Sequence, residues 1–446
     1  MKKARPSKNL FDFASLPEPQ KPDGKATLTP KLRFPEFREA PNWSTKPLGE
    51  LGDFSSGGTP SKDNPEYWNG HIPWISASSM HTTTIAKSDH RVTSKAIGNG
   101  TRIAPKGSFL ILVRGSMLFN RVPMGIAEID VAFNQDVKAL APNGGVNTRF
   151  LLYFLSAIES QIQINETGIG AGKIDTDVLK ALPVPFPTPP EQQKIAECLS
   201  SVDELIAAEA RKLDALKTHK KGLMQQLFPR EGETQPRLRF PEFQDAGEWV
   251  ENKLISLSSE PLSNGVFNDP KKVGTGYKLI NVSDMYIETT IDESRLSLLE
   301  LSPSEFEGNQ VITGDIFFTR SSLVKSGIAV SNIYLGSSSD VTYDGHLIRF
   351  RSNNSKVIPV FAHYIFKTAL IRAQLIARGK TATMTTIGQA DVASVILFYP
   401  DTNEQQRIAD CLTSLDDLIA AQTQKLSTLK THKKGLMQQL FPSAEN

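Results

Sequence analysis

Residues 191–229 read EQQKIAECLSSVDELIAAEARKLDALKTHKKGLMQQLFP, and residues 404–442 read EQQRIADCLTSLDDLIAAQTQKLSTLKTHKKGLMQQLFP. About three-quarters of the positions are identical, whereas the segments that precede the two stretches match far less. Apolar residues recur in both at spacings that alternate between three and four, which is the a/d pattern of a heptad helix. We therefore expect two near-copies of one long helix, each preceded by a divergent domain.

The expected helix seam is apolar apart from two polar layers, which fall at Glu209 and Lys220 in the first copy and at Gln422 and Lys433 in the second. Nearly five heptads with a narrow stripe, present twice, favour a coiled coil between the copies. The alternative is an amphipathic helix packed on its own domain. The apolar seam members are Ile195, Leu199, Val202, Ile206, Leu213, Leu216, Leu223, Leu227, Ile408, Leu412, Leu415, Ile419, Leu426, Leu429, Leu436 and Leu440.

The polar layers predict how the two helices run. A parallel pair would bring Lys220 against Lys433 inside the seam, where repulsion and desolvation oppose packing. In an antiparallel pair Lys220 faces Leu415 and Glu209 faces Leu426, so each polar side chain can extend past an apolar partner. We predict antiparallel packing. A helix of about 37 residues spans about 55 Å, which exceeds one DNA turn of about 34–36 Å. Such a length suits a protein that reads two half-sites separated by an unread gap.

Both halves of the chain also open on the same motif. Leu32-Arg-Phe-Pro-Glu-Phe37 is followed by Trp43, and Leu238-Arg-Phe-Pro-Glu-Phe243 is followed by Trp249. A repeat of about 200 residues is far longer than a solenoid period, so it indicates a tandem duplication of domain plus helix. Between each motif and its helix, β-branched and aromatic runs bounded by Gly, Ser and Asn predict strands, with some helical spacing between them.

The predicted fold class is α+β, with two mixed α/β domains, two long antiparallel coiled-coil helices and a pseudo-two-fold duplication. The expected boundaries are a disordered basic tail at 1–30, domain 1 at 31–188, helix 1 at 189–229, domain 2 at 230–401, helix 2 at 402–442 and a tail at 443–446.

Composition sets the broad class of the protein. A hydrophobic content of 39% with 22% charged residues is ordinary for a soluble globular protein. No apolar run approaches the roughly 20 residues of a membrane helix, and two cysteines exclude a disulfide framework, so we expect a cytoplasmic protein without a membrane partner. The net charge of +2 is too small to identify a polyanion partner. Binding to nucleic acid would require either locally clustered basic residues or a partner that neutralises much of the phosphate charge.

Taken in order, several short motifs make the chain similar to a known family. Over about 32–442 it resembles the specificity subunits of type I restriction-modification enzymes. The resemblance rests on the two LRFPEF motifs, Ser56-Gly-Gly-Thr-Pro-Ser61, Pro65-Glu-Tyr-Trp68, Gly70-His-Ile-Pro-Trp-Ile75, Phe133-Asn-Gln-Asp136, Leu182-Pro-Val-Pro-Phe186 and the EQQ-(K/R)-I-A starts at 191 and 404.

The resemblance implies a non-catalytic recognition subunit that binds double-stranded DNA. Each domain would read one half of an asymmetric bipartite site, while the helices set the spacer and dock two modification subunits. Those partners would bind S-adenosylmethionine and methylate adenine, and restriction subunits with ATPase and endonuclease activity, using ATP and Mg, would join them. No cofactor is expected on this chain. The second domain has Ser263-Asn-Gly265 in place of the SGGTP motif and lacks the Tyr-Trp pair, which fits a different half-site.

Readout of DNA needs polar and basic side chains on loops that reach base edges and phosphates. Arg114 and Arg320 stand at matching places just after a strand, where an arginine could bind guanine or phosphate, the alternative being a structural salt bridge. The DNA-binding candidates are Ser55, Ser56, Thr59, Ser61, Arg114, Ser116 and Lys173 in domain 1, and Asn264, Lys271, Lys272, Arg320, Ser321, Arg378 and Lys380 in domain 2.

Apparent catalytic signals do not meet their requirements. The stretch Gly168-Ile-Gly-Ala-Gly-Lys173 lacks the first glycine and the Ser/Thr of a P-loop. No histidines form an HxxxH pair and the two cysteines lie far apart, so we expect neither a metal site nor catalytic residues. A self-contained DNA methyltransferase or nuclease and a coiled-coil interaction protein remain as alternatives. Apolar residues outside the seam (Leu205, Ala208, Leu418 and Ala421) predict a surface that partners cover.

Overall fold

Two helices of 39 residues, α3 (Pro189–Leu227) and α8 (Thr402–Leu440), form where the heptad pattern predicts them. The computed structural model describes residues 29–167 and 170–442, so the predictions for the tails at 1–28 and 443–446 lie outside the described residues. Pro189 starts α3 with its fixed φ, and Pro229 and Pro442 follow the two helix ends, where a proline cannot extend the helix. Every predicted seam position is buried or half-buried.

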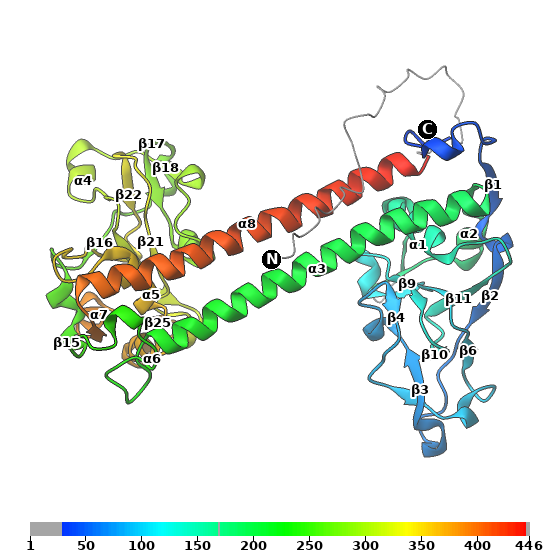
Figure 1. Ribbon diagram of the computed structural model, residues 1–446, viewed down its shortest axis with the longest axis horizontal. Coiled ribbons are helices and arrows are strands. Elements are labelled where there is room, and N and C mark those ends of the chain that lie inside the picture. Colours follow the sequence, from blue (N-terminus) through cyan, green and yellow to red (C-terminus); the bar gives the residue numbers. More distant parts are fainter. Residues whose placement is uncertain (1–28, 168–169, 443–446) are drawn as a thin grey trace, which may run out of the picture. The chain divides into compact units, whose positions relative to one another are not determined.

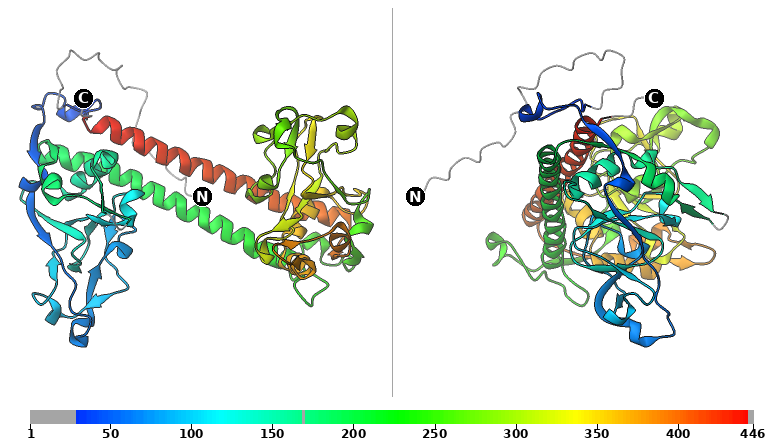
Figure 2. Two further views of the ribbon diagram at one scale, coloured as in Figure 1. Left: turned by 180° about the vertical axis from the view of Figure 1, so that it is seen from behind. Right: turned by 90° about the vertical axis from the view of Figure 1, so that its right-hand side faces the viewer.

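The chain divides into two units, and each long helix contributes to both. Unit 1 comprises Met1–Ala208 and Leu426–Asn446, and unit 2 comprises Glu209–Lys425. We call residues 29–188 head 1 and residues 230–401 head 2. Figures 1 and 2 show α3 and α8 side by side. Among the described residues, no helix is both long enough and apolar enough to cross a membrane.

Contacts across the seam show that α3 and α8 run antiparallel, as predicted. In unit 2 the Lys220 Nζ atom lies 2.5 Å from Asp416 Oδ1, and Gln422 Nε2 donates to Glu209 Oε2 at 2.5 Å. Residue numbers thus rise along one helix while they fall along the other. In unit 1 the Lys433 Nζ atom lies 2.6 Å from Asp203 Oδ1.

The partners of the polar layers differ from the prediction. Lys220 does not merely extend past Leu415, because its ammonium binds the next residue, Asp416. Glu209 does not face Leu426 alone, because it accepts hydrogen bonds from Gln422 and Lys425. A half-buried charge is destabilising without a partner, so carboxylates at the flank of the seam take the lysines.

A tyrosine from each head completes the lysine–aspartate contact. In unit 1 the Tyr153 hydroxyl of α1 (Thr148–Ala157) donates to Asp203 at 2.8 Å, and Lys433 lies 5.1 Å from the tyrosine ring centroid. In unit 2 the Tyr364 hydroxyl of α5 (Pro359–Phe366) donates to Asp416 at 2.7 Å, with Lys220 at 5.2 Å. Burial raises the pKa of both tyrosines, which keeps them protonated donors. We call these two sets the Tyr–Asp–Lys clusters.

The strands of head 1 form four small sheets, mostly antiparallel, and their hydrophobic core lies under α1. The central strand β7 (Phe109–Leu112) is buried on both faces. The sheets are β2 (Gly52–Ser56), β11 (Val137–Pro142), β7, β9 (Met124–Ala127) and β4 (Thr84–Ile85); β5 (Arg91–Val92), β3 (Trp68–Ile75), β10 (Val131–Phe133) and β6 (Arg102–Ala104); β12 (Asn165–Thr167), β13 (Ala171–Lys173) and β8 (Arg114–Gly115); and β1 (Ser44–Pro47) with β14 (Pro183–Phe186). Helix α2 spans Thr176–Ala181.

Head 2 repeats the plan of head 1 with its own strands. Its central strand β19 (Ile316–Thr319) is also buried throughout. The sheets are β16 (Ser263–Asn264), β23 (Leu347–Phe350), β19 and β21 (Ser331–Ile333); β18 (Ser297–Leu299), β17 (Val273–Ile280) and β22 (Val341–Tyr343); β20 (Ser321–Ser322), β25 (Thr385–Thr386) and β24 (Lys380–Thr381); and β15 (Val250–Lys253) with β26 (Ile396–Tyr399). The short helices are α4 (Pro303–Glu307), α6 (Ala369–Arg378) and α7 (Gln389–Ala393).

The Leu-Phe-Pro ends of the long helices belong to the head cores. Phe441, just after α8, packs on Phe150 with ring centroids 5.5 Å apart in unit 1. Phe228, just after α3, packs on Phe361 at the same distance in unit 2. The last turn of each helix is therefore part of a folded domain. This explains why both copies end on the same residues, Leu-Phe-Pro.

The LRFPEF motif binds the start of the helix that closes its own half. Arg33 donates twice to the buried Glu191, at 2.7 and 2.8 Å, and also to the carbonyl of Ala40. Arg239 makes the same contacts with the buried Glu404, at 2.9 and 2.5 Å. A bidentate arginine contact stabilises a buried carboxylate that would otherwise be costly to desolvate. The first Glu of each EQQ start is thus the partner of the LRFPEF arginine.

Removing the aspartate of a Tyr–Asp–Lys cluster should destabilise the protein, because the lysine loses the carboxylate that it binds. We expect Asp416→Ala to lower the free energy of unfolding by about 1–2 kcal/mol, because Lys220 is left half-buried without its partner. Urea unfolding followed by circular dichroism measures the change. The matched control is Asp417→Ala, which removes an exposed neighbouring carboxylate. Equal destabilisation by the two substitutions would contradict this role for the cluster.

Candidate nucleic-acid interface

The glycine loop of head 1 has a counterpart in head 2 that the sequence motif conceals. A Cβ atom on Gly57 would lie 2.0 Å from the Phe133 carbonyl oxygen, and one on Gly265 would lie 1.9 Å from the Tyr343 carbonyl oxygen. The following amide donates to the same carbonyl in each head, from Gly58 and from Val266, both at 2.9 Å. Only glycine permits this approach of two backbones. With Gly57 matched to Gly265, the SGGTP loop at 56–60 therefore corresponds to the Asn-Gly-Val-Phe-Asn stretch at 264–268.

Backbone hydrogen bonds also correct the correspondence of the two arginines. In head 1 the Val113 amide donates to the Asp136 carbonyl at 2.8 Å. In head 2 the Arg320 amide donates to the His346 carbonyl at 2.9 Å, in the same place after the central strand. Arg320 thus corresponds to the buried Val113, and Arg114 to Ser321. The predicted match of Arg114 with Arg320 is wrong by one residue, and side chains one residue apart on a strand point to opposite faces.

Head 1 brings several of its candidate residues together at neighbouring strand ends. Ser56 on β2 lies opposite Lys138 on β11, whose Nζ atom donates to the serine hydroxyl at 2.6 Å. Arg114 on β8 lies opposite Lys173 on β13. Burial lowers the pKa of Lys138, and the nearby charges of Arg114 and Lys180 act in the same direction, whereas Asp136 opposes them. Positive charge is therefore concentrated at this edge of head 1.

The other head 1 candidates border this edge to different degrees. Thr59 donates its hydroxyl hydrogen to Gln135 at 2.8 Å, and Ser116 is exposed at the start of a turn. Ser61 holds a local turn, because its hydroxyl accepts from the Asp63 amide. Ser55 is half-buried on β2. Of the glycine-rich stretch 168–173, residues 168 and 169 lie outside the described residues, and the last three form β13.

Two of the predicted DNA-binding residues of head 2, Asn264 and Arg378, form hydrogen bonds within the head. The Asn264 amide donates to the Leu347 carbonyl at 2.9 Å and to the Gly345 carbonyl at 3.3 Å. The Arg378 guanidinium donates to Ser394 Oγ and to the Gln374 carbonyl, both at 2.9 Å. Both side chains are half-buried, and their donors hold loops and helix ends within the head. These donors are used within the head, so we leave both side chains out of the candidate interface.

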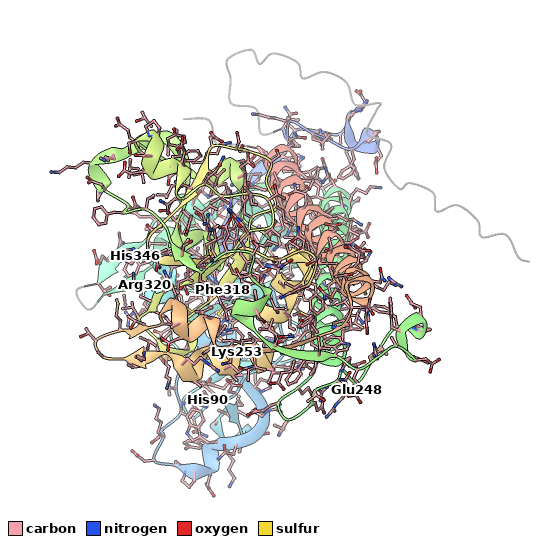
Figure 3. All side chains as sticks on the ribbon, turned by 90° about the vertical axis from the view of Figure 1, so that its left-hand side faces the viewer. His90, Glu248, Lys253, Phe318, Arg320 and His346 are labelled. Carbon is pink, nitrogen blue, oxygen red and sulfur yellow. The ribbon has the colours of Figure 1, made fainter. Side chains whose placement is uncertain are left out.

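Arg320, Ser321 and Lys380 remain close to one another at the small β20-β25-β24 sheet. Ser321 and Lys380 both lie opposite Thr386 of the middle strand. Arg320 is exposed and lies beside His346, which Figure 3 labels next to it. Lys271 and Lys272 are exposed on the turn before β17, which belongs to a different sheet. Arg320, Ser321 and Lys380 therefore define the candidate interface of head 2.

Sequence reasoning missed Lys138, Gln135 and His346. Gln135 and His346 lie shortly after the residue whose carbonyl the glycine loop binds, and Lys138 lies on the next strand, β11. A lysine in an alternating strand gives little signal by itself. Its importance appears only when β2 and β11 are paired, because Ser56 and Lys138 are 82 residues apart. The described residues contain no group of three or more His, Cys, Asp or Glu side chains that could hold a metal ion. Cations and hydroxyls at these strand ends, from the exposed Arg114 to the half-buried Lys138 and Lys173, suit contacts to phosphates and base edges.

Comparisons with known proteins identify a family whose sequences match this chain. The sequence profile described as the type I restriction modification DNA specificity domain matches residues 41–218 and 269–431. The specificity subunit of the type I restriction enzyme EcoR124I/EcoR124II of Escherichia coli is 35% identical over 167 residues, which cover 36% of this chain. The chain spans only about two-fifths of that relative's length, 41%.

Two further proteins match over nearly the full chain. The MjaVIII specificity subunit of Methanocaldococcus jannaschii is 22% identical and is aligned over 92% of this chain and 93% of its own. The crystal structure of the type I restriction-modification S subunit from M. genitalium superposes with a TM-score of 0.53 at 16% identity. It covers 94% of this chain and all of that one, so the two share a fold.

Removing a cation from the head 1 edge should weaken binding to DNA without altering the fold. We expect Lys138→Ala to lower affinity for duplex DNA and to reduce the slope of log affinity against log salt by about one, the effect of one lost phosphate contact. Fluorescence anisotropy at several salt concentrations measures both quantities. Lys217→Ala is the control, because Lys217 is an exposed cation that lies outside the head 1 edge and is paired with Glu288. An unchanged salt slope for Lys138→Ala would argue against the proposed interface.

Proposed function

The chain belongs to the family of type I restriction-modification DNA specificity subunits, and from that premise we propose that it selects the DNA sequence on which such a complex acts. In this proposal each head reads one half of an asymmetric bipartite site in double-stranded DNA. The observation that carries it is one backbone framework, present twice, that presents different side chains at corresponding places.

The corresponding places differ in chemistry. Where head 1 has Arg114, head 2 has Ser321, and where head 1 has Val113, head 2 has Arg320. Hydrogen-bonding groups at base edges distinguish the four base pairs in the major groove, so moving a guanidinium by one strand position changes the bases that it can reach. Two heads of this kind suit two different half-sites. A symmetric reader would need the same side chains in both.

The long helices support a fixed gap between the half-sites. A 39-residue helix at about 1.5 Å per residue is about 58 Å long, which exceeds the roughly 34–36 Å of one DNA turn. Two Tyr–Asp–Lys clusters fix the register of the pair, one in each unit. We propose that helix length and register together set the number of base pairs that are not read.

Partner subunits would supply the chemistry. Leu205 on α3 and Leu418 on α8 occupy equivalent positions outside the seam and are 44% and 54% exposed. We propose that two modification subunits cover these faces, one for each copy, and that restriction subunits join through them. S-adenosylmethionine, ATP and Mg would bind to those partners, whereas this chain would bind no cofactor and catalyse no step. A cytoplasmic location stays part of the proposal.

The proposal predicts a split methylation motif. In a host that expresses this chain with its cognate modification subunit, long-read sequencing should show one bipartite motif with a methylated adenine in each half. The control is a host that expresses the modification subunit alone, where the motif should be absent. Methylation of DNA by the purified chain with only S-adenosylmethionine would contradict the proposal, as would a motif that does not depend on the chain.

A further inference from the structure

An exposed apolar cluster surrounds the end of β20 in head 2. Leu323, directly after β20, is 85% exposed. A single exposed leucine is ordinary on a protein surface. Leu323, however, lines a hollow of about 340 Å³ together with Tyr286 and Met384, which are 54% and 41% exposed. Ser321 and Ser322 complete the lining. Three large apolar side chains thus gather around one open hollow.

Charge around the hollow favours a negatively charged ligand. None of its five lining residues is acidic. The exposed Arg320 immediately precedes the lining serines, and the exposed Lys325 follows Leu323 after one residue. Lys380 lies on the same small sheet. The ligand for such a place combines phosphate charge with a small apolar group.

Duplex DNA offers one such group at the base edges of the major groove, the C5-methyl group of thymine. We propose that Leu323, with Tyr286 and Met384, contacts a thymine methyl group in the half-site of head 2, while Arg320 and Ser321 bind neighbouring polar groups. This inference rests on the proposed function, since it requires that head 2 reads DNA. It adds the identity of one base and the residues that recognise its methyl group.

The same feature is absent from the corresponding place in head 1. Because Arg114 corresponds to Ser321, Ser116 occupies the place of Leu323. A serine hydroxyl forms hydrogen bonds and offers little apolar surface to a methyl group. Methyl recognition by this position is therefore a property of head 2, and it contributes to the asymmetry of the two readers.

Uracil substitution tests the contact, because uracil differs from thymine only by the missing methyl group. The full chain in complex with its modification subunit is titrated with duplexes of its methylation motif, in which each thymine is replaced by uracil in turn. We expect one replacement to weaken binding about fourfold, the effect of losing one buried methyl-sized group. The same replacement should have no further effect on the Leu323→Ala complex, which should bind the thymine duplex about fourfold more weakly.

Matched variants separate the possible outcomes. Leu335→Ala, which removes another exposed leucine of head 2, should retain the full uracil effect. Equal uracil effects in the wild-type and Leu323→Ala complexes would overturn the proposal, as would a half-site in which no thymine is sensitive. Loss of modification-subunit assembly in Leu323→Ala, with an unchanged uracil effect, would identify the hollow as a protein contact instead. Absence of any sequence-specific binding would contradict the proposed function itself.

Discussion

A lysine inside each helix seam is the constraint on which the rest of the structure depends. Lys220 and Lys433 occupy core layers of a heptad pattern, where an unpaired charge is strongly unfavourable. Each is accommodated by an aspartate on the opposite helix and a tyrosine from a head. One contact therefore fixes the direction and register of the helices and also attaches a head to them. Equivalent residues form the same contact in both units, and the lysine and the aspartate belong to the long helices, the part of the chain in which the two copies are most alike.

The ends of each helix hold the heads in a second way. The buried Glu191 and Glu404 receive the arginines of the LRFPEF motifs, and Phe228 and Phe441 enter the head cores. These contacts use residues that are the same in both copies. The loops above the central strands take no part in them, so side chains such as Arg114 and Arg320 can differ without disturbing the framework. Shared anchors and variable loops are what two readers on one scaffold require.

The sequence predicted the duplication, the fold class and the antiparallel helices, because heptad spacing and internal repeats are local patterns. It did not predict Asp203 or Asp416, since both flank the seam and acquire meaning only from the partner helix. It matched Arg114 with Arg320 because similar residues follow both arginines. The backbone hydrogen bonds of the strands show that the correct correspondence differs by one residue. It also proposed Arg378 as a DNA contact, although the guanidinium is used within the head. Side-chain availability depends on tertiary partners that local patterns do not contain.

We propose that the two heads read two half-sites independently on one scaffold. The most direct measurement is the methylation motif, obtained by long-read sequencing, of hosts that express the complex with substitutions in one head at a time. We predict that Arg114→Ala with Lys138→Ala changes only one half of the motif, that Arg320→Ala with Ser321→Ala changes only the other, and that the spacer stays constant. A change of both halves, or of the spacer, by substitutions in a single head would contradict it.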